Sequence, residues 1–249
     1  MQSVDLKSIT PQIFNVLDTP PPAVPPKVTA RQDADDWSPR LNPTQREAYE
    51  CTADFILQYG GKASGKSEGG IHAMIRHCYE ERDALAILIA PQIRSGKEGS
   101  FARLERLLDV WQNGNWTDRH MRTRADAGIG LQYTKSVMDP NTKDRCLFIS
   151  NRHGGWSKVI LMSLPYASVV EKRMKNIEPS FVYVEEITEL EAGTGYTGEE
   201  FFTFVALQLN RRPFISGPQQ YYASCNPEGP SHWVYKKWFI DCVDSATGE

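Results

Sequence analysis

The pattern of apolar and polar residues along the chain alternates between short apolar runs and longer stretches with helical periodicity. Apolar runs of about four to eight residues, bounded by glycine or acidic residues, are typical of buried strands in parallel sheets. The pattern predicts strands at 55–59, 85–90, 181–184 and 220–225, and helices at 67–81, 100–111, 167–176, 199–210 and 232–239. This alternation of strands and helices predicts an α/β fold with a mostly parallel central sheet flanked by helices.

Residues 129–164 follow a different pattern, with short apolar segments separated by turn residues. IGLQYTKSV, RCLFIS and WSKVILMSL have the alternation of antiparallel strands, and DPNTKD has the composition of a tight turn. We therefore expect an antiparallel β insert within the α/β domain.

Proline is concentrated near the N-terminus, since eight of the 16 prolines fall within the first 43 residues. PPPAVPP and RQDADD cannot form a periodic apolar face, so residues 1–41 are expected to form a flexible arm, with docking to a partner as the alternative. Asn42 is a good helix N-cap, and Pro43 suits the first helical turn. Residues 42–249 are expected to form one domain.

Composition and charge exclude several classes of protein. The 249 residues are 40% hydrophobic and 24% charged, as in ordinary globular domains. The sequence contains no apolar run of about 18 residues, so no membrane span is expected. The N-terminus does not resemble a secretion signal. The five cysteines contain no CxxC pair, so neither a zinc site nor a disulfide framework is expected. A net charge of −3 argues against coating of nucleic acid by bulk electrostatics, but it allows a local basic surface.

The strongest motif follows the first predicted strand and matches the phosphate-binding pattern GxxxxGK[ST]. The preceding strand and the following helix fit the chemistry, because backbone N–H groups and the helix N-terminus then face the phosphates. Lys66 is expected to hold the β- and γ-phosphates of ATP, and Ser67 to ligate Mg²⁺. The expected ATP-binding residues of this loop are Gly60, Gly61, Lys62, Ala63, Ser64, Gly65, Lys66 and Ser67.

Two acidic residues follow the buried strand 181–184, at the edge where open α/β sheets bind ligands. Glu185 is expected to hold Mg²⁺, directly or through water, and Glu186 to act as the catalytic base that polarises the attacking water. These two roles require that the turn splays the side chains apart. The 119 positions from Lys66 to Glu185 leave room for an intervening strand, as in motors and helicases. A second acid favours ATP hydrolysis over phosphoryl transfer to a metabolite.

Four segments together resemble the ATPase domain of the large terminase subunit, the DNA-packaging motor of tailed bacteriophages. They are LNPTQREAY, QYGGKASGKS, FVYVEEITEL and ASCNPEGPSHWVYKKW, and they span about residues 41–240. The resemblance implies a RecA-like (ASCE) P-loop fold and Mg²⁺-dependent ATP hydrolysis in the host cytoplasm. It also implies translocation of double-stranded DNA into a procapsid. The implied partners are the portal protein, the small terminase subunit and further copies of the chain in a ring, often a pentamer. The family's nuclease domain is not expected within these residues.

The resemblance also assigns roles to individual residues. It places Gln45 on the adenine base. Ser224 and Asn226 would lie at a strand end that senses the γ-phosphate and couples its loss to DNA gripping, with a simple Asn-Pro turn as the alternative. A basic residue about ten to twelve positions before the acids would reach the neighbouring subunit's ATP. Arg173 suits this role better than Lys175, because a planar guanidinium can bridge phosphoryl oxygens. A solvated basic face is the alternative.

Two positions depart from the pattern of the family. Lys62 stands where relatives often have arginine, which keeps the charge but not the bidentate fork. Glu185 stands where many relatives have aspartate. Three other classes of protein remain as alternatives: another RecA-like DNA translocase or helicase, a P-loop metabolite kinase, and a non-enzymatic nucleotide-binding assembly module.

Overall fold

The computed structural model describes the domain in a set of ranges, to which every structural statement below refers. They are 39, 41–61, 64–90, 99–117, 123–125, 129–138, 144–163, 177–191, 198–206, 208–209, 215–226 and 229–236. Nearly all of the expected arm 1–41 lies outside these ranges. So do Lys62, Ala63, Arg173 and the expected helix 167–176, and the predictions made for them stay predictions.

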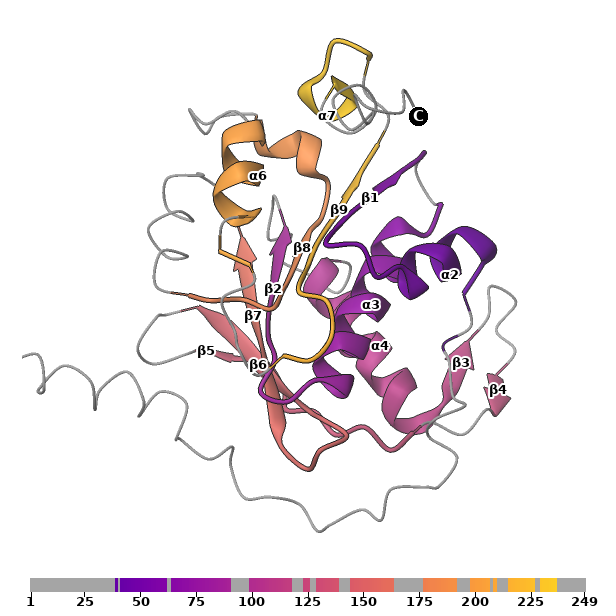
Figure 1. Cartoon of the computed structure of the whole chain (residues 1–249). Coiled ribbons are helices and arrows are strands. Elements are labelled where there is room, and N and C mark those ends of the chain that lie inside the picture. Colours follow the sequence, from indigo (N-terminus) through magenta and orange to yellow (C-terminus); the bar gives the residue numbers. More distant parts are fainter. Residues whose placement is uncertain are drawn as a thin grey trace, which may run out of the picture. The chain divides into compact units, whose positions relative to one another are not determined.

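Seven strands of the described chain form one mixed sheet (Figure 1). In spatial order they are β1 (Phe55–Tyr59), β9 (Gln220–Cys225), β8 (Phe181–Val184), β2 (Leu85–Ala90), β7 (Trp156–Ser163), β6 (Arg145–Ser150) and β5 (Val137–Met138). The first five strands are parallel, and β6 and β5 continue the sheet in antiparallel pairing. β9 and β8 therefore separate β1 from β2, its neighbour in sequence.

The parallel register brings three loops to one edge of the sheet. Tyr59 at the end of β1 pairs with Cys225 of β9, and Val184 at the end of β8 pairs with Ala223 of β9. The loop after β1, the acidic residues after β8 and Asn226 after β9 therefore open at the same carboxyl edge, where open α/β sheets bind ligands.

Helices cover both faces of the sheet, because its central strands are apolar on both sides. Every residue of β2, β8 and β9 is buried. One face packs against α3 (Lys66–Glu80), α4 (Ser100–Asn113) and α2 (Pro43–Glu50), and the other against α6 (Gly198–Ala206), η2 (Ile187–Glu191) and α7 (Trp233–Tyr235). Alternate residues of one strand serve the two layers, as Leu88 and Ile87 of β2 do. None of the described helices combines the length and apolarity that a membrane span requires.

The start of the domain agrees with the sequence. The Asn42 side chain accepts the Gln45 N–H at 2.9 Å, and the Gln45 side chain accepts the Asn42 N–H at 2.9 Å. This reciprocal capping box satisfies two N–H groups that the helix itself leaves unpaired. The prediction that Asn42 caps a helix with Pro43 in its first turn is confirmed for α2.

The expected β insert is confirmed in its pairing, but it is not a separate layer. β6 and β7 form an antiparallel hairpin, and β7 also pairs in parallel with β2. The hairpin thus extends the main sheet, because β7 has two edges and its buried Val159 and Leu161 join the same core as β2. IGLQYTKSV contributes only Val137 to the two-residue strand β5, and its Tyr133 forms a bridge with Ile149. A two-stranded ribbon of β3 (Asn115–Thr117) and β4 (Thr123–Ala125) follows α4.

One predicted helix is shorter than expected, and another lies only partly within the described residues. The helix expected at 199–210 is α6 and ends at Ala206. In the described part of 232–239, the α-helix covers only Trp233–Tyr235.

Candidate nucleotide-binding site

The loop between β1 and α3 turns through a glycine that no other residue could replace easily. Gly65 has a φ of +86°, in the left-handed region that L-residues rarely adopt. A Cβ atom there would also collide with Nε2 of Gln45. The loop is tied to the sheet at its start, since Gly60 N–H donates to the Cys225 carbonyl of β9 at 3.3 Å. The GxxxxGKS pattern therefore forms the strand–loop–helix turn that phosphate binding requires.

Lys66, the first residue of α3, directs its ammonium group back into this loop. Its Nζ donates to the carbonyls of Gly60 at 2.7 Å and Gly61 at 3.0 Å, and to Oδ1 of Asn226 at 3.3 Å. Only 9% of Lys66 is exposed. The cation is thus held beside the carboxyl edge of the sheet by neutral oxygens, which a phosphate could replace.

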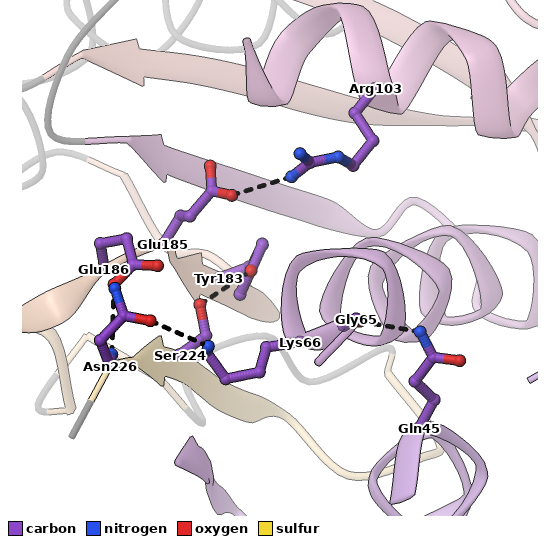
Figure 2. Close-up of polar contacts among 9 residues, drawn as sticks. All are labelled: Gln45, Gly65, Lys66, Arg103, Tyr183, Glu185, Glu186, Ser224 and Asn226. Carbon is purple, nitrogen blue, oxygen red and sulfur yellow. Dashed lines mark hydrogen bonds and ion pairs between the residues drawn. The ribbon is translucent and has the colours of Figure 1, made fainter. Parts of the chain in front are cut away.

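The two acids after β8 point in different directions, as Figure 2 shows. Glu186 has a φ of +48°, a left-handed conformation that costs a non-glycine residue on the order of 1–3 kcal/mol. This turn sends the Glu185 side chain toward Arg103 of α4 and the Glu186 side chain toward Asn226, which follows β9. The splaying that the two chemical roles require is therefore present, and it comes with backbone strain.

Glu186, Asn226 and Lys66 form a chain of hydrogen bonds at the carboxyl edge (Figure 2). Oε2 of Glu186 accepts the side-chain Nδ2 of Asn226 at 2.9 Å and its backbone N–H at 3.2 Å. Burial raises the pKa of Glu186, while the Lys66 charge and the Asn226 N–H oppose that rise. A half-buried carboxylate with a raised pKa, held in place by an amide, is suited to accept a proton from water.

Gln45 lies directly beside the phosphate loop and is buried. Its Nε2 donates to the Gly65 carbonyl at 2.9 Å, and its Oε1 accepts the Asn42 N–H. The residue expected to read adenine therefore also ties α2 to the turn of the loop. Its amide keeps a second N–H and a second oxygen lone pair with which it could contact a base.

Ser224 connects to the loop through a tyrosine that the sequence did not single out. The hydroxyl of Tyr183 in β8 is hydrogen-bonded to Ser224 of β9 at 3.0 Å, and Ser67 of α3 belongs to its electrostatic surroundings. Burial raises the pKa of Tyr183 strongly. The expected coupling residue Ser224 thus contacts a phenol whose surroundings include Ser67, the expected Mg²⁺ ligand. Tyr183 is the only polar side chain in the buried strand FVYV. Because a buried hydroxyl needs a hydrogen-bond partner, the sequence could have indicated that Tyr183 has one.

Arg103 is the second residue that the sequence did not indicate. Its Nη1 lies 3.0 Å from Oε1 of Glu185, and the two residues are 82 positions apart. An arginine in an amphipathic helix gives no sequence signal of such a partner.

The donor set fits a magnesium ion. Ser67 offers a hydroxyl and Glu185 a carboxylate, which are the hard oxygen ligands that Mg²⁺ prefers. The described residues contain no group of three or more His, Cys, Asp or Glu side chains that could cage a metal by themselves.

The strand order, with β9 and β8 between β1 and β2, and the loop that follows β1 define a RecA-like P-loop fold. The chain is similar in structure to the large terminase from a thermophilic bacteriophage. One crystal form of that protein gives a TM-score of 0.54 with 14% identity, covering 83% of this chain and 44% of that chain. The same terminase in complex with ATP-gamma-S gives a TM-score of 0.51 with 14% identity, covering 81% and 42% of the two chains.

The expected resemblance to large terminases is thus confirmed at the level of the fold. This chain spans less than half the length of those solved terminases. No protein-family model matches the sequence, and no curated protein matches it.

Proposed function

We propose that this chain is the ATPase motor domain of a viral large terminase, which hydrolyses ATP to translocate double-stranded DNA through the portal into a procapsid. The observation that carries the proposal is the chain of contacts from Lys66 through Asn226 to Glu186, at the mouth of a phosphate loop. The shared fold with a phage large terminase supports the choice of motor over metabolite kinase.

In the proposed reaction, Lys66 leaves the carbonyls of Gly60 and Gly61 and binds the β- and γ-phosphates. Ser67 and Glu185 would hold a Mg²⁺ ion, which would supply charge neutralisation at the phosphate oxygens. Glu186 takes a proton from the water that attacks the γ-phosphorus, and the bond to the ADP oxygen breaks to release phosphate. The raised pKa of Glu186 makes it a better proton acceptor at neutral pH than an ordinary carboxylate.

Asn226 gives this mechanism a means of coupling. Its Oδ1 accepts a hydrogen bond from Lys66, and its Nδ2 donates one to Glu186. One amide therefore contacts both the phosphate-binding lysine and the catalytic base. When Lys66 moves to a phosphate, Asn226 loses one partner while it still holds the base. We infer that Asn226 and Ser224 pass the state of the γ-phosphate to β9, and that Gln45 contacts the adenine.

The remaining parts of the proposal concern partners. We place Arg173 in trans at the ATP of the next subunit, in a homo-oligomeric ring such as a pentamer that docks on the portal protein. The small terminase subunit and the DNA complete the assembly, in the cytoplasm of the host. A trans-acting group predicts that ATP turnover per subunit rises with protein concentration.

The proposal is tested by ATP turnover and by movement on DNA. We expect Mg²⁺-dependent turnover that increases with protein concentration and with linear duplex DNA, and that Lys66→Ala abolishes. Displacement of a triplex-forming oligonucleotide from the duplex, without strand separation, would report translocation. Strand separation would instead indicate a helicase, turnover that requires a small-molecule acceptor would indicate a kinase, and nucleotide binding without turnover would indicate an assembly module.

A further inference from the structure

Arg103 forms an ion pair with Glu185, the residue to which the proposed function assigns magnesium binding. Nη1 of Arg103 lies 3.0 Å from Oε1 of Glu185, and Figure 2 shows the guanidinium directed from α4 toward this carboxylate. The side chains are 31% and 12% exposed. The pair is thus largely shielded from water, where a charge-assisted hydrogen bond is stronger than at a free surface.

Arg103 lies at an electrostatically unfavourable position in its helix, and its ion pair with Glu185 compensates for this. It lies in the first turn of α4, where the helix dipole disfavours a positive charge. Arg106, one turn further along the same helix, is exposed to solvent. The favourable pairing with Glu185 offsets the unfavourable position of Arg103, so the pair is a specific contact between α4 and the end of β8.

The backbone that carries this carboxylate is anchored to the sheet. Glu185 follows the last residue of β8, and its backbone N–H donates to the Ile89 carbonyl of β2 at 2.9 Å. The carboxylate therefore stays at the carboxyl edge whichever cation it faces. Arg103 occupies Oε1 of this carboxylate, and two cations beside one carboxylate repel each other, so a guanidinium and a divalent cation compete for the group.

We propose that Arg103 holds Glu185 in the nucleotide-free state and that the arrival of Mg²⁺ with nucleotide displaces it. Arg103 is a positioning residue that acts through Glu185, and its release frees the start of α4 when the site is loaded. This inference rests on the proposed function, since it assumes that the site binds Mg²⁺ with a nucleoside triphosphate. By competing with Mg²⁺ for Glu185, Arg103 raises the Mg²⁺ concentration at which the site is half-occupied.

The test measures binding of a fluorescent, non-hydrolysable ATP analogue, mant-AMPPNP, as Mg²⁺ is varied. We expect Arg103→Gln to lower the Mg²⁺ concentration for half-maximal binding by about 3- to 10-fold, because the competing cation is gone. Affinity measured in EDTA should change less than about twofold. Arg103→Lys, which keeps the charge without the planar fork, should fall between wild type and Arg103→Gln.

Two controls separate this role from a general loss of charge or of structure. Arg106→Gln removes the same charge from an exposed position of the same helix and should leave the Mg²⁺ midpoint unchanged. In a Glu185→Gln background, Arg103→Gln should have no further effect, because there is no carboxylate left to compete for. Thermal unfolding in EDTA shows whether each variant is folded. Stabilisation by Mg²⁺ and mant-AMPPNP should be larger in Arg103→Gln than in wild type.

An unchanged Mg²⁺ midpoint in folded Arg103→Gln would overturn the inference. A raised midpoint would also overturn it, because Arg103 would then support the loaded state. If wild type bound mant-AMPPNP with no dependence on Mg²⁺, the proposed function would fail and the inference with it. Mg²⁺-dependent binding by wild type with identical behaviour of the variant would reject the inference alone.

Discussion

Helix α3 approaches the sheet closely at a glycine, and adding one methyl group there tests the packing beneath the site. A Cβ atom at Gly70 would lie 2.7 Å and 2.8 Å from ring carbons of Tyr183, and 3.0 Å from a ring carbon of Tyr222. Both rings are fully buried. A hydrogen bond to Ser224 holds the Tyr183 hydroxyl in place, so the ring cannot tilt away freely.

The expected effect of Gly70→Ala follows from two opposing contributions. Alanine favours an α-helix by about 1 kcal/mol relative to glycine. Overpacking a core typically costs about 1–3 kcal/mol, and the upper end applies here because the ring of Tyr183 must move by about 0.7 Å to reach an ordinary contact of 3.4 Å. We therefore expect a net loss of about 2 kcal/mol in the free energy of unfolding.

Urea unfolding followed by tryptophan fluorescence measures this loss, with Gly69→Ala as the matched control. A Cβ at Gly69 comes within 3.2 Å of the amide of Gln58, the movable end of a side chain. The same gain in helix propensity then offsets a small adjustment, and we expect a change of less than about 0.5 kcal/mol. If Gly70→Ala proved as stable as wild type, the close packing of Tyr183 under α3 would be refuted.

Two further predictions concern the base and the pH dependence of stability. Asn226→Ala should lower the single-turnover rate of ATP hydrolysis by roughly 10- to 100-fold while the ATP dissociation constant changes only a few-fold, because Asn226 orients Glu186; an unchanged rate would contradict that role. Burial lowers the pKa of His77 to about 4 and that of His72 to about 3, below the usual value of 6.5, so the unfolded chain binds more protons. Stability should therefore be full above pH 6.5 and fall by roughly 2 kcal/mol per histidine by pH 5. Urea midpoints across this range should show the loss, and His77→Gln should reduce the slope; an equal slope in the variant would contradict the assignment.

The sequence predicted those elements whose signal is local. The strand at 55–59 runs directly into glycines, and the strand at 181–184 is four apolar residues followed by two acids, so both ends are marked by composition. The capping box at Asn42 and Gln45 is likewise contained in four residues. The loop, the lysine and the acids could be found for the same reason, because phosphate chemistry requires particular residues at fixed spacing.

The parts that were not predicted depend on contacts between distant residues. Nothing in WSKVILMSL distinguishes a hairpin strand from one that also pairs with β2, since the alternation is the same in both cases. The left-handed turn at Glu186 follows from the surrounding structure, because glutamate has no preference for that conformation. The partners of Arg103 and Tyr183 lie on other elements, and periodicity assigns these residues only to a helix and a strand.

The central claim is that Glu186 is the base of a Mg²⁺-dependent ATPase whose nucleotide is held by Lys66. It is tested most directly by measuring ATP binding and single-turnover hydrolysis on one preparation of Glu186→Gln. The account predicts an ATP dissociation constant within a few-fold of wild type and hydrolysis slower by at least about 100-fold. Hydrolysis by Glu186→Gln at the wild-type rate would contradict the account.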